Sequence, residues 1–337
     1  MTLWVVHAGK LSQGQSTAIQ ENCVVAGWDE VGDLSTYKGL NDLKSALRSI
    51  YPDDKEKTII NWAGQLLAFR DQIQLGDLVI LPLKGQPFFA VGEVSGPYQY
   101  NQTGPAGAFH RRQTRWLDTA FQRSRLDKDL LFSIGSALTV SRPRAPEAET
   151  RVRAALKGEK IRSAKVDVAA ATEDATDYAD LARNDIADRI IQKFKGHGLE
   201  GLVEDVLRAE GFVTTRSKPG PDGGRDILAG RGPLGLEAPR IVVQVKSQSS
   251  PVDASTVREL QGVVSRYGAE YGLFVAWGGF KSSVQVEIQR DHFRIRLWDA
   301  GHLIDAVLAH YHQLPEKTRA MIPLRQIWTL APDEDEV

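Results

Sequence analysis

The sequence predicts a protein of two domains, each of which mixes α-helices with β-strands. The chain has 337 residues, which is long for a single hydrophobic core. Residues 1–140 contain several short β-rich runs with two helical stretches among them, whereas residues 186–325 alternate longer helices with strands. The stretch SRPRAPEAET, rich in proline and charge, lies between them and predicts a domain boundary.

The composition is that of an ordinary globular protein, with 42% hydrophobic and 25% charged residues. The longest apolar runs, such as LVILPL and GLFVAW, are too short to span a membrane. The first residues lack the charged and apolar regions of a signal peptide. Cys23 is the only cysteine, which excludes an internal disulfide and a cysteine-based zinc site. We therefore expect a cytoplasmic protein without a membrane segment.

The first domain, residues 1–140, is expected to be rich in strands. Its β-rich runs, bounded by Gly, Pro, Asn or Asp, are LWVVHAG, NCVVAGW, GDLVILPL, FFAVGEVSG and LFSIGSALTV. Two further stretches, LNDLKSALRSIYP and INWAGQLLAFRDQI, carry apolar residues at helical spacing. The pattern thus favours a mixed α/β domain with much strand.

Residues 141–185 are expected to form a charged, partly helical linker. Eight lysines and arginines lie between Arg142 and Lys165, against three glutamates. From Asp167 to Asp188 the balance reverses, and Arg183 is the only basic residue among seven aspartates and glutamates. Such a segment could contact phosphates or could be a solvated connection, and both interpretations stay open. Residues 326–337 are expected to be a frayed acidic tail.

The second domain, residues 186–325, has a regular order of elements. A helical stretch, DIADRIIQKFKGHGLEGLVEDVLRAEGF, comes first, and strands follow at residues 227–229 and 241–245. The helix DASTVRELQGVVSRYG, the buried strand YGLFVAW, a helix near SSVQVEIQRDHF, the strand IRLW and the helix GHLIDAVLAHYHQL complete the order. This succession predicts a central sheet flanked by helices.

Polar residues gather where two of these strands meet. In IVVQVK, Gln244 and Lys246 share one face of the strand because side chains alternate. Asp226 comes immediately before the preceding strand, and Glu200 lies on the first helix. Carboxylate and amide oxygens suit Mg²⁺, and a lysine can hold or activate a water and offset charge on a phosphoryl group. Taken alone, the Gln/Lys pair would also fit the wet face of an edge strand.

These residues, in this order, resemble the core of the PD-(D/E)XK nucleases and most closely the Mrr-type restriction endonucleases. The matching segments are GLEGLVEDVLRAEGF, GPDGGRDI, QVK, VRELQGVV, YGLFVAWGGFKSS and LWDAGHLIDAV, which cover about residues 190–312. In the Mrr branch, glutamine replaces the usual second acid. The resemblance therefore implies a nuclease domain with a mixed sheet.

The resemblance also implies roles for individual residues. Asp226 would be the principal metal ligand, Gln244 would complete the metal shell with help from the Val245 carbonyl, and Lys246 would orient or activate the attacking water. Glu200 would bind the metal directly or through water. Glu204, one helical turn later, is the alternative for that role.

Other nearby residues receive structural interpretations beside functional ones. Asp222 is interpreted as a turn residue. Arg225 departs from the small apolar residue usual in the family and would be a surface side chain or a phosphate contact. Gln261 would line the site or lie on the surface, and His197 is expected in a loop.

The first domain resembles the PUA-like superfamily, which includes the EVE domains and related readers of modified bases. The segments that carry this likeness are WVVHAG, VAGW, NWAGQLLAF, GDLVILP, AVGEVSGPYQY and HRRQTRWL. It implies a small β-barrel whose aromatic pocket holds a flipped base. The candidates for the pocket are Trp28, Asn61, Trp62 and Tyr98. Arg111, Arg112 and Arg115 are the candidates for phosphate binding.

Together these resemblances imply a modification-dependent DNA restriction endonuclease. It would use Mg²⁺, with Mn²⁺ as a substitute, and would leave 5′-phosphate ends on double-stranded, base-modified DNA. Cleavage of both strands needs two active centres, so a homodimer is expected. Two alternatives stay open: a DNA repair or junction-resolving nuclease, and a nucleic-acid-binding sensor without catalytic activity.

Overall fold

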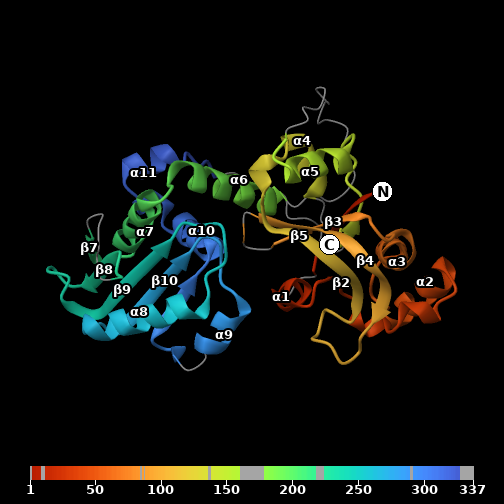
Figure 1. The fold of residues 1–337 in the computed structure, drawn as a ribbon, viewed down its shortest axis with the longest axis horizontal. Coiled ribbons are helices and arrows are strands. Elements are labelled where there is room, and N and C mark those ends of the chain that lie inside the picture. The colour runs from red at the N-terminus through yellow and green to blue at the C-terminus, as the bar shows by residue number, and fades with distance from the viewer. Residues whose placement is uncertain are drawn as a thin grey trace. The chain divides into compact units, whose positions relative to one another are not determined.

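A computed structural model of the chain describes residues 2–8, 12–83, 86, 88–135, 138–159, 178–217, 224–288 and 291–326 (Figure 1). The chain divides into two compact units. The described residues of the first lie within 2–83 and 88–181, and those of the second are residue 86 and residues within 182–326. Helix α6 (Tyr178–Lys193) runs from the end of the first unit into the second. In the described part of the chain, no helix is both long and apolar enough to cross a membrane.

The first unit is built on a six-stranded mixed sheet. The strand order is β2 (Cys23–Ala26), β5 (His110–Gln122), β4 (Phe88–Tyr100), β3 (Leu78–Pro82), β1 (Leu3–Val6) and β6 (Val140–Ser141). β1 pairs with β3 in parallel, and the other neighbours are antiparallel. The two long strands β4 and β5 form the ribbon at its centre.

Both faces of this sheet are buried, which explains the nearly continuous apolar runs of its short strands. In β1, Leu3 and Val5 pack into one core cluster, and Trp4 and Val6 pack into another. Helices α4 (Lys128–Ile134) and α5 (Ala148–Leu156) supply residues to the first cluster. The π-helical turn Ala68–Gln72 supplies residues to the second.

The sheet is open, so the expectation of a closed barrel is wrong for the described part of this unit. β2 and β6 stand at the two ends of the strand order and do not pair with each other. Register shifts in the β4–β5 ribbon mark local irregularities, and bulges of this kind increase strand twist. The ribbon is thus irregular, and its hydrogen-bonded ladder does not close on itself.

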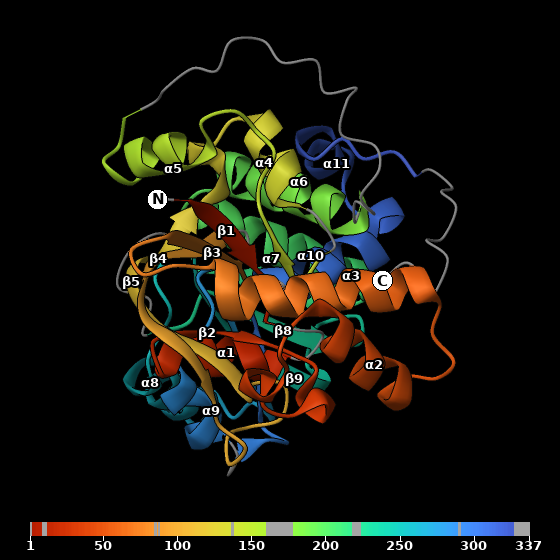
Figure 2. The same cartoon turned by 90° about the vertical axis from the view of Figure 1, so that its right-hand side faces the viewer.

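Two helices make a separate aromatic layer in the first unit. α2 (Leu40–Ile50) and α3 (Glu56–Leu67) lie against each other, as Figure 2 shows. Their apolar residues form one cluster, and five aromatic side chains of the described residues pack against it: Trp28, Tyr37, Tyr51, Trp62 and Tyr98. Another helix of this unit is α1 (Ser12–Gln20).

Part of the expected linker belongs to the first unit. Ala148, Val152 and Ala155 of α5 are buried in the core beneath the sheet. Arg153 of the same helix bonds to Glu93 of β4 at 2.9 Å and holds the pKa of that carboxyl below its ordinary value. α5 is therefore packed structure. Residues 160–177 of the expected linker, and the acidic tail after residue 326, lie outside the described residues.

The second unit is a five-stranded mixed sheet between helices, as the order of its elements predicts. The strand order is β11 (Ile295–Trp298), β10 (Tyr271–Ala276), β9 (Glu237–Lys246), β8 (Ile227–Arg231) and β7 (Val213–Arg216). β9, β10 and β11 are parallel, whereas β8 and β7 run antiparallel to their neighbours. The edge strand β7 is not among the predicted strands.

Helices cover both faces of this second sheet (Figure 1). α8 (Ala254–Arg266) and α9 (Ser282–Ile288) pack on the face that carries Val242 and Phe274. α7 (His197–Ala209) and α10 (Ala300–Ala309) lie on the other side, and α11 (Glu316–Met321) follows. The core beneath α8 therefore supports the strand that carries the predicted catalytic residues.

Phe274 is a direct test of that support. It is fully buried between β9 and α8, so Phe274→Ala should lower the free energy of unfolding of the second unit by about 3–5 kcal/mol. Leu234→Ala is the matched control, because Leu234 is 79% exposed and its loss should cost less than about 0.5 kcal/mol. Urea denaturation measures both, and equal effects would contradict this packing.

Candidate active site

Asp226 is bound on three sides where β8 begins. Its N–H donates to the carbonyl of Val243 at 2.9 Å, and its own carbonyl accepts from the N–H of Ser217 at 2.9 Å. Its carboxylate Oδ2 accepts from the N–H of Val245 at 2.6 Å. The side chain therefore takes the place of a backbone acceptor and lies against the end of β9.

Gln244 and Lys246 flank that contact on the face of the sheet that α8 covers. They pair in register with Phe274 and Ala276, which belong to the core beneath α8. Gln244 is 5% exposed, and its Oε1 has no hydrogen-bond partner in the described structure. Lys246 is half-buried, and its side chain forms no hydrogen bond or ion pair with a described residue.

The carbonyl of Val245 points toward Asp226. The N–H and C=O of one strand residue point the same way, and they alternate in direction along the strand. The carbonyl of Lys246 accepts from Trp277 N–H on the β10 side at 2.8 Å, whereas Val245 N–H donates to Asp226 on the β8 side. The Val245 carbonyl is therefore directed to the same side of β9 as the Asp226 carboxylate.

These atoms fit a hard divalent cation. A buried amide oxygen without a partner is costly unless a donor or a cation satisfies it. The carboxylate of Asp226, the Oε1 of Gln244 and the carbonyl of Val245 are oxygen ligands of the kind that Mg²⁺ prefers. The described residues contain no cluster of three or more His, Cys, Asp or Glu that could hold a metal.

Glu200 lies near this end of the sheet but does not touch Asp226. Gly201 beside it approaches Arg216, which pairs with Ile227 and so places the first turn of α7 level with the start of β8. Among described contacts, the only partner of the Glu200 carboxylate is His197 Nδ1, at 2.7 Å. Glu200 as a metal ligand stays a prediction.

Glu204, the alternative helix acid, is occupied by structural contacts. It is buried, and its Oε1 accepts from Arg208 Nη2 at 2.8 Å and from Thr214 Oγ1 at 3.0 Å. Arg216 Nε lies 3.6 Å from its Oε2. These contacts join α7 to β7 and leave Glu204 less suited than Glu200 to bind a metal.

The remaining predicted residues around this site have structural contacts. The Arg225 guanidinium stacks over the ring of Tyr267, 4.6 Å from its centroid. Gln261 Nε2 donates to Asp291 at 2.8 Å. His197 is exposed at the start of α7. Asp222 lies outside the described residues.

Three of the four predicted pocket residues of the first unit lie in one cluster. Trp28, Trp62 and Tyr98 pack against the apolar core of α2 and α3. The rings of Trp28 and Trp62 meet edge to face, with centroids 6.2 Å apart. Asn61 is exposed on α3 and accepts from Gln65 Nε2 at 3.1 Å. The rings thus contact one another, and Asn61 lies at the surface next to Trp62.

His110 joins two of these aromatic residues and was not among the predicted ones. Its Nε2 lies 3.1 Å from the carbonyl of Trp28, which can only accept, so Nε2 carries the hydrogen. Nδ1 then accepts from the Tyr98 hydroxyl at 2.9 Å, and that hydroxyl oxygen accepts from Leu34 N–H at 3.1 Å. Every polar atom in this chain of contacts is satisfied.

This network holds Trp28 in a strained backbone conformation. Its φ of 67° and ψ of 42° are left-handed, which is rare for a bulky residue and costs about 1–3 kcal/mol. Strain of this kind persists only where the surroundings impose it. In the sequence, His110 stands inside the basic run FHRRQ, and nothing in that run distinguishes it from a surface residue.

Two of the three arginines that are predicted to bind phosphate are buried, and their phosphate-binding role stays a prediction. Arg111 pairs with Glu21 and donates to the carbonyl of Ala108 at 2.6 Å. Arg112 donates to the carbonyls of Phe69 and Arg70 at 3.0 and 2.9 Å. Only Arg115 presents an exposed side chain, and it pairs with Glu93.

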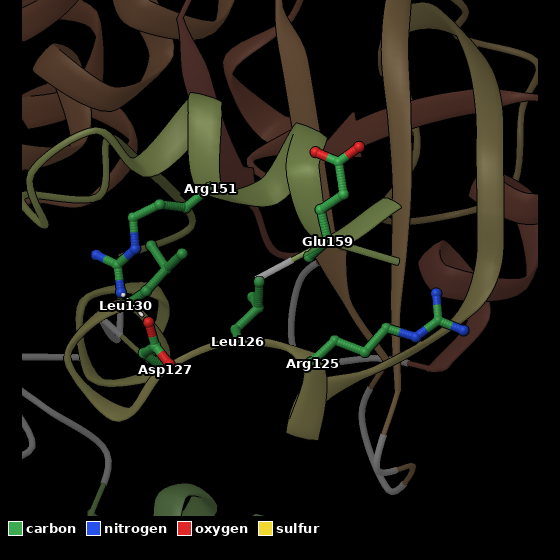
Figure 3. Close-up of a pocket in the computed structure, with 7 residues that line it drawn as sticks. Arg125, Leu126, Asp127, Leu130, Arg151 and Glu159 are labelled. Atoms are coloured by element: carbon green, nitrogen blue, oxygen red, sulfur yellow. Dashed lines mark hydrogen bonds and ion pairs between the residues drawn. The ribbon is translucent and has the colours of Figure 1, made fainter. Parts of the chain in front are cut away.

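The first unit also contains a small polar cavity, shown in Figure 3. Its volume of about 10 Å³ holds about one water molecule. The buried guanidinium of Arg151 lines it and bonds to both oxygens of Asp129, at 2.6 and 2.7 Å. Arg151 holds the pKa of Asp129 below its ordinary value. The cavity is too small for a nucleotide and is occupied at its wall by an ion pair.

Comparison with known proteins identifies the second unit. Residues 191–307 match the Mrr_cat family, described as a restriction endonuclease. The second unit therefore carries a restriction-endonuclease domain, which indicates a DNA nuclease and confirms the predicted Mrr-type resemblance. Residues 4–133 match DUF8426, a domain of unknown function. The PUA-like or EVE-like assignment of the first unit stays a prediction.

Two solved structures match the chain with low identity and low TM-scores. One is the DNA modification-dependent restriction endonuclease AspBHI, with 16% identity, a TM-score of 0.34, and coverage of 78% of this chain and 72% of that one. The other is the MspJI restriction endonuclease in complex with a 27-mer oligonucleotide, with 19% identity, a TM-score of 0.33, and coverage of 90% and 73%. No curated protein matches the chain.

The His110 network makes the stability of the first unit depend on pH. Burial lowers the pKa of His110 below its ordinary 6.5, so below pH 6.5 the unfolded chain binds a proton that the folded chain resists. The free energy of unfolding should therefore fall as the pH drops below 6.5. His110→Gln can still donate to the Trp28 carbonyl but cannot titrate, so its stability should fall less over the same range.

Urea unfolding followed by tryptophan fluorescence at a series of pH values measures this difference. Parallel curves for the two proteins would contradict a buried neutral His110.

Proposed function

We propose, from the premise that residues 191–307 form a restriction-endonuclease domain, that this chain is a modification-dependent DNA endonuclease. The observation that carries the catalytic part is the contact between Asp226 and Val245 at 2.6 Å beside the unpartnered Oε1 of Gln244. It supports a divalent-cation site near Lys246, where β8 begins and β9 ends. Hydrolysis of a phosphodiester bond is the chemistry that this arrangement supports best.

The residues of the site have separate roles in this proposal. Asp226, Gln244 and the Val245 carbonyl would hold Mg²⁺, or Mn²⁺ in its place, and Glu200 would bind through a water. When bound, the cation would act as a Lewis acid toward the phosphoryl oxygens and lower the pKa of a bound water. Lys246 would hold the attacking water by its Nζ and offset charge that develops on the phosphoryl oxygens.

The proposed reaction is hydrolysis of a phosphodiester bond by one water molecule. The oxygen of water forms a bond to phosphorus and loses a proton to solvent, and the bond from phosphorus to the 3′ oxygen breaks. The leaving 3′ oxygen takes a proton, so the products are a 5′-phosphate and a 3′-hydroxyl. Cleavage of both strands of a duplex requires two such centres, and we propose that the chain acts as a homodimer on DNA.

For the first unit we propose recognition of a modified base. The convergence of Trp28, Trp62 and Tyr98 supports this, because flipped bases stack on aromatic rings. Asn61, exposed beside Trp62, is the candidate for a hydrogen bond to a base edge. Arg115 is the accessible candidate for a backbone phosphate. A repair or junction-resolving nuclease would share these features but would cut a different DNA substrate. A sensor without catalysis would share them and cut none.

Asp226→Ala and Lys246→Ala test the catalytic assignment. Each should reduce cleavage in Mg²⁺ by at least about 10²–10³-fold, since each removes a group that stabilises the transition state, while DNA binding stays nearly unchanged. A gel assay of duplex cleavage measures the rate, and fluorescence anisotropy measures the affinity. Metal-dependent cleavage by purified Asp226→Ala protein would exclude the assignment.

A panel of DNAs that differ only in one base tests the substrate. We expect faster cleavage of methylated or hydroxymethylated duplexes than of unmodified ones, and Trp62→Ala should reduce that preference because it removes a stacking surface worth about 1–3 kcal/mol per base. Lys246→Ala is the control for contaminating nucleases. Preference for branched DNA would favour a repair or junction-resolving enzyme, and no cleavage with either Mg²⁺ or Mn²⁺ would favour a sensor.

A further inference from the structure

Arg216 lies at the same end of the strands of the second sheet as the proposed catalytic residues. It is the last residue of β7 and pairs in register with Ile227, the first residue of β8. Ser217, its neighbour, donates its N–H to the carbonyl of Asp226 at 2.9 Å. Arg216 is therefore two strands away from β9, about 10 Å at ordinary strand spacing.

The first turn of α7 leaves room for the Arg216 guanidinium. A Cβ at Gly201 would lie 2.6 Å from Arg216 Nη1, so a larger residue would displace the side chain. On the other side, Arg216 Nε lies 3.6 Å from the buried carboxylate of Glu204. The guanidinium thus packs on the face of the sheet opposite to Gln244 and Lys246.

The donors of Arg216 are not used by the described part of the protein. The 3.6 Å contact with Glu204 is beyond hydrogen-bond distance, and the side chain of Arg216 makes no hydrogen bond with a described residue. Glu204 is already bonded to Arg208 and Thr214. The side chain of Arg216 is 42% exposed, so its planar set of donors is accessible at this edge.

Three other arginines of this unit use their donors within the described protein. Arg240 bonds to Glu270, Arg258 bonds to Glu287, and Arg231 donates to the carbonyl of Glu210. An accessible guanidinium with unused donors, oriented by a carboxylate that another arginine already neutralises, is suited to bidentate binding of a phosphate.

We propose that Arg216 binds a backbone phosphate of the DNA next to the phosphate that is cleaved. This inference rests on the proposed nuclease function, because it names a substrate contact of the same active site. The distance of two strands from β9 favours a neighbouring phosphate over the scissile one. Glu204 is then a positioning residue, and Gly201 is the small residue that the contact requires.

Arg216→Gln and Arg208→Gln form a matched pair for the test. Both arginines contact Glu204, but Arg208 bonds to it and to Thr214 at 2.8 and 2.7 Å. Arg216→Gln should weaken binding of a fluorescent duplex in EDTA about tenfold, whether or not the DNA is modified, and should reduce the salt dependence of log K by about one phosphate contact. Arg208→Gln should keep the affinity and instead lower the urea midpoint of the second unit.

Gly201→Ala provides an independent variant. Its methyl group should displace the Arg216 guanidinium and weaken DNA binding, with little change in the urea midpoint, since the displaced atoms belong to a flexible side chain. Equal losses of binding for Arg216→Gln and Arg208→Gln, or an unchanged affinity and salt slope for Arg216→Gln, would overturn the inference.

A cleavage assay of the wild-type protein distinguishes a failure of this inference from a failure of the proposed nuclease function. If that protein cuts no DNA in Mg²⁺ or Mn²⁺, the nuclease function fails, and the proposed active-site contact fails with it. If it cuts DNA and Arg216→Gln binds as well as Arg208→Gln, only the role of Arg216 fails.

Discussion

The hydrogen bond from the Val245 amide to the Asp226 carboxylate is the contact on which the rest of the site depends. It ties the first residue before β8 to the end of β9, and it replaces a backbone acceptor with a charged side chain. A charge-assisted bond to a backbone N–H is stronger than a neutral one and fixes the carboxylate in direction. Through it, Asp226 is held beside Gln244 and Lys246, which lie on a strand supported by the core beneath α8.

Buried polar atoms give this edge of the sheet its chemical character. An amide oxygen that is buried without a partner lowers stability, and a protein interior contains few such atoms. Gln244, whose side-chain oxygen is unpaired, directly precedes Val245, whose N–H donates to the Asp226 carboxylate. The carbonyl of Val245 is directed to the same side of β9 as that carboxylate. The same edge presents unused donors on its other face, from Arg216 beside α7. The oxygen ligands on one face are suited to bind a cation, and the guanidinium on the other face is suited to bind a phosphate of the DNA backbone.

Much of the second unit could be predicted from the sequence because local pattern and tertiary structure agree there. The apolar residues of β9 and β10 are buried on both faces of the sheet, and their nearly continuous apolar runs indicate this burial. The edge strand β7 was missed, because VTTR is short, polar and mostly exposed. In the first unit the number and pairing of strands depend on long-range register, which no local pattern reports, so the barrel was predicted wrongly. Arg111 and Arg112 lie in a basic run of the sequence, yet they are buried and bonded to Glu21 and to backbone carbonyls that no local pattern reports. Trp28, Trp62 and Tyr98 pack against one cluster. His110, which contacts two of them, could not be distinguished from a surface residue in the sequence.

Calorimetric titration of Mn²⁺ into the full chain would test the central claim, that Asp226, Gln244 and Val245 form a cation site, without requiring a DNA substrate. The account predicts one site per chain, with heat of binding that disappears in Asp226→Asn and weakens in Gln244→Leu, a variant that fills the same space without an oxygen ligand. Binding that is unchanged in both variants would contradict it, since the cation would then be held elsewhere.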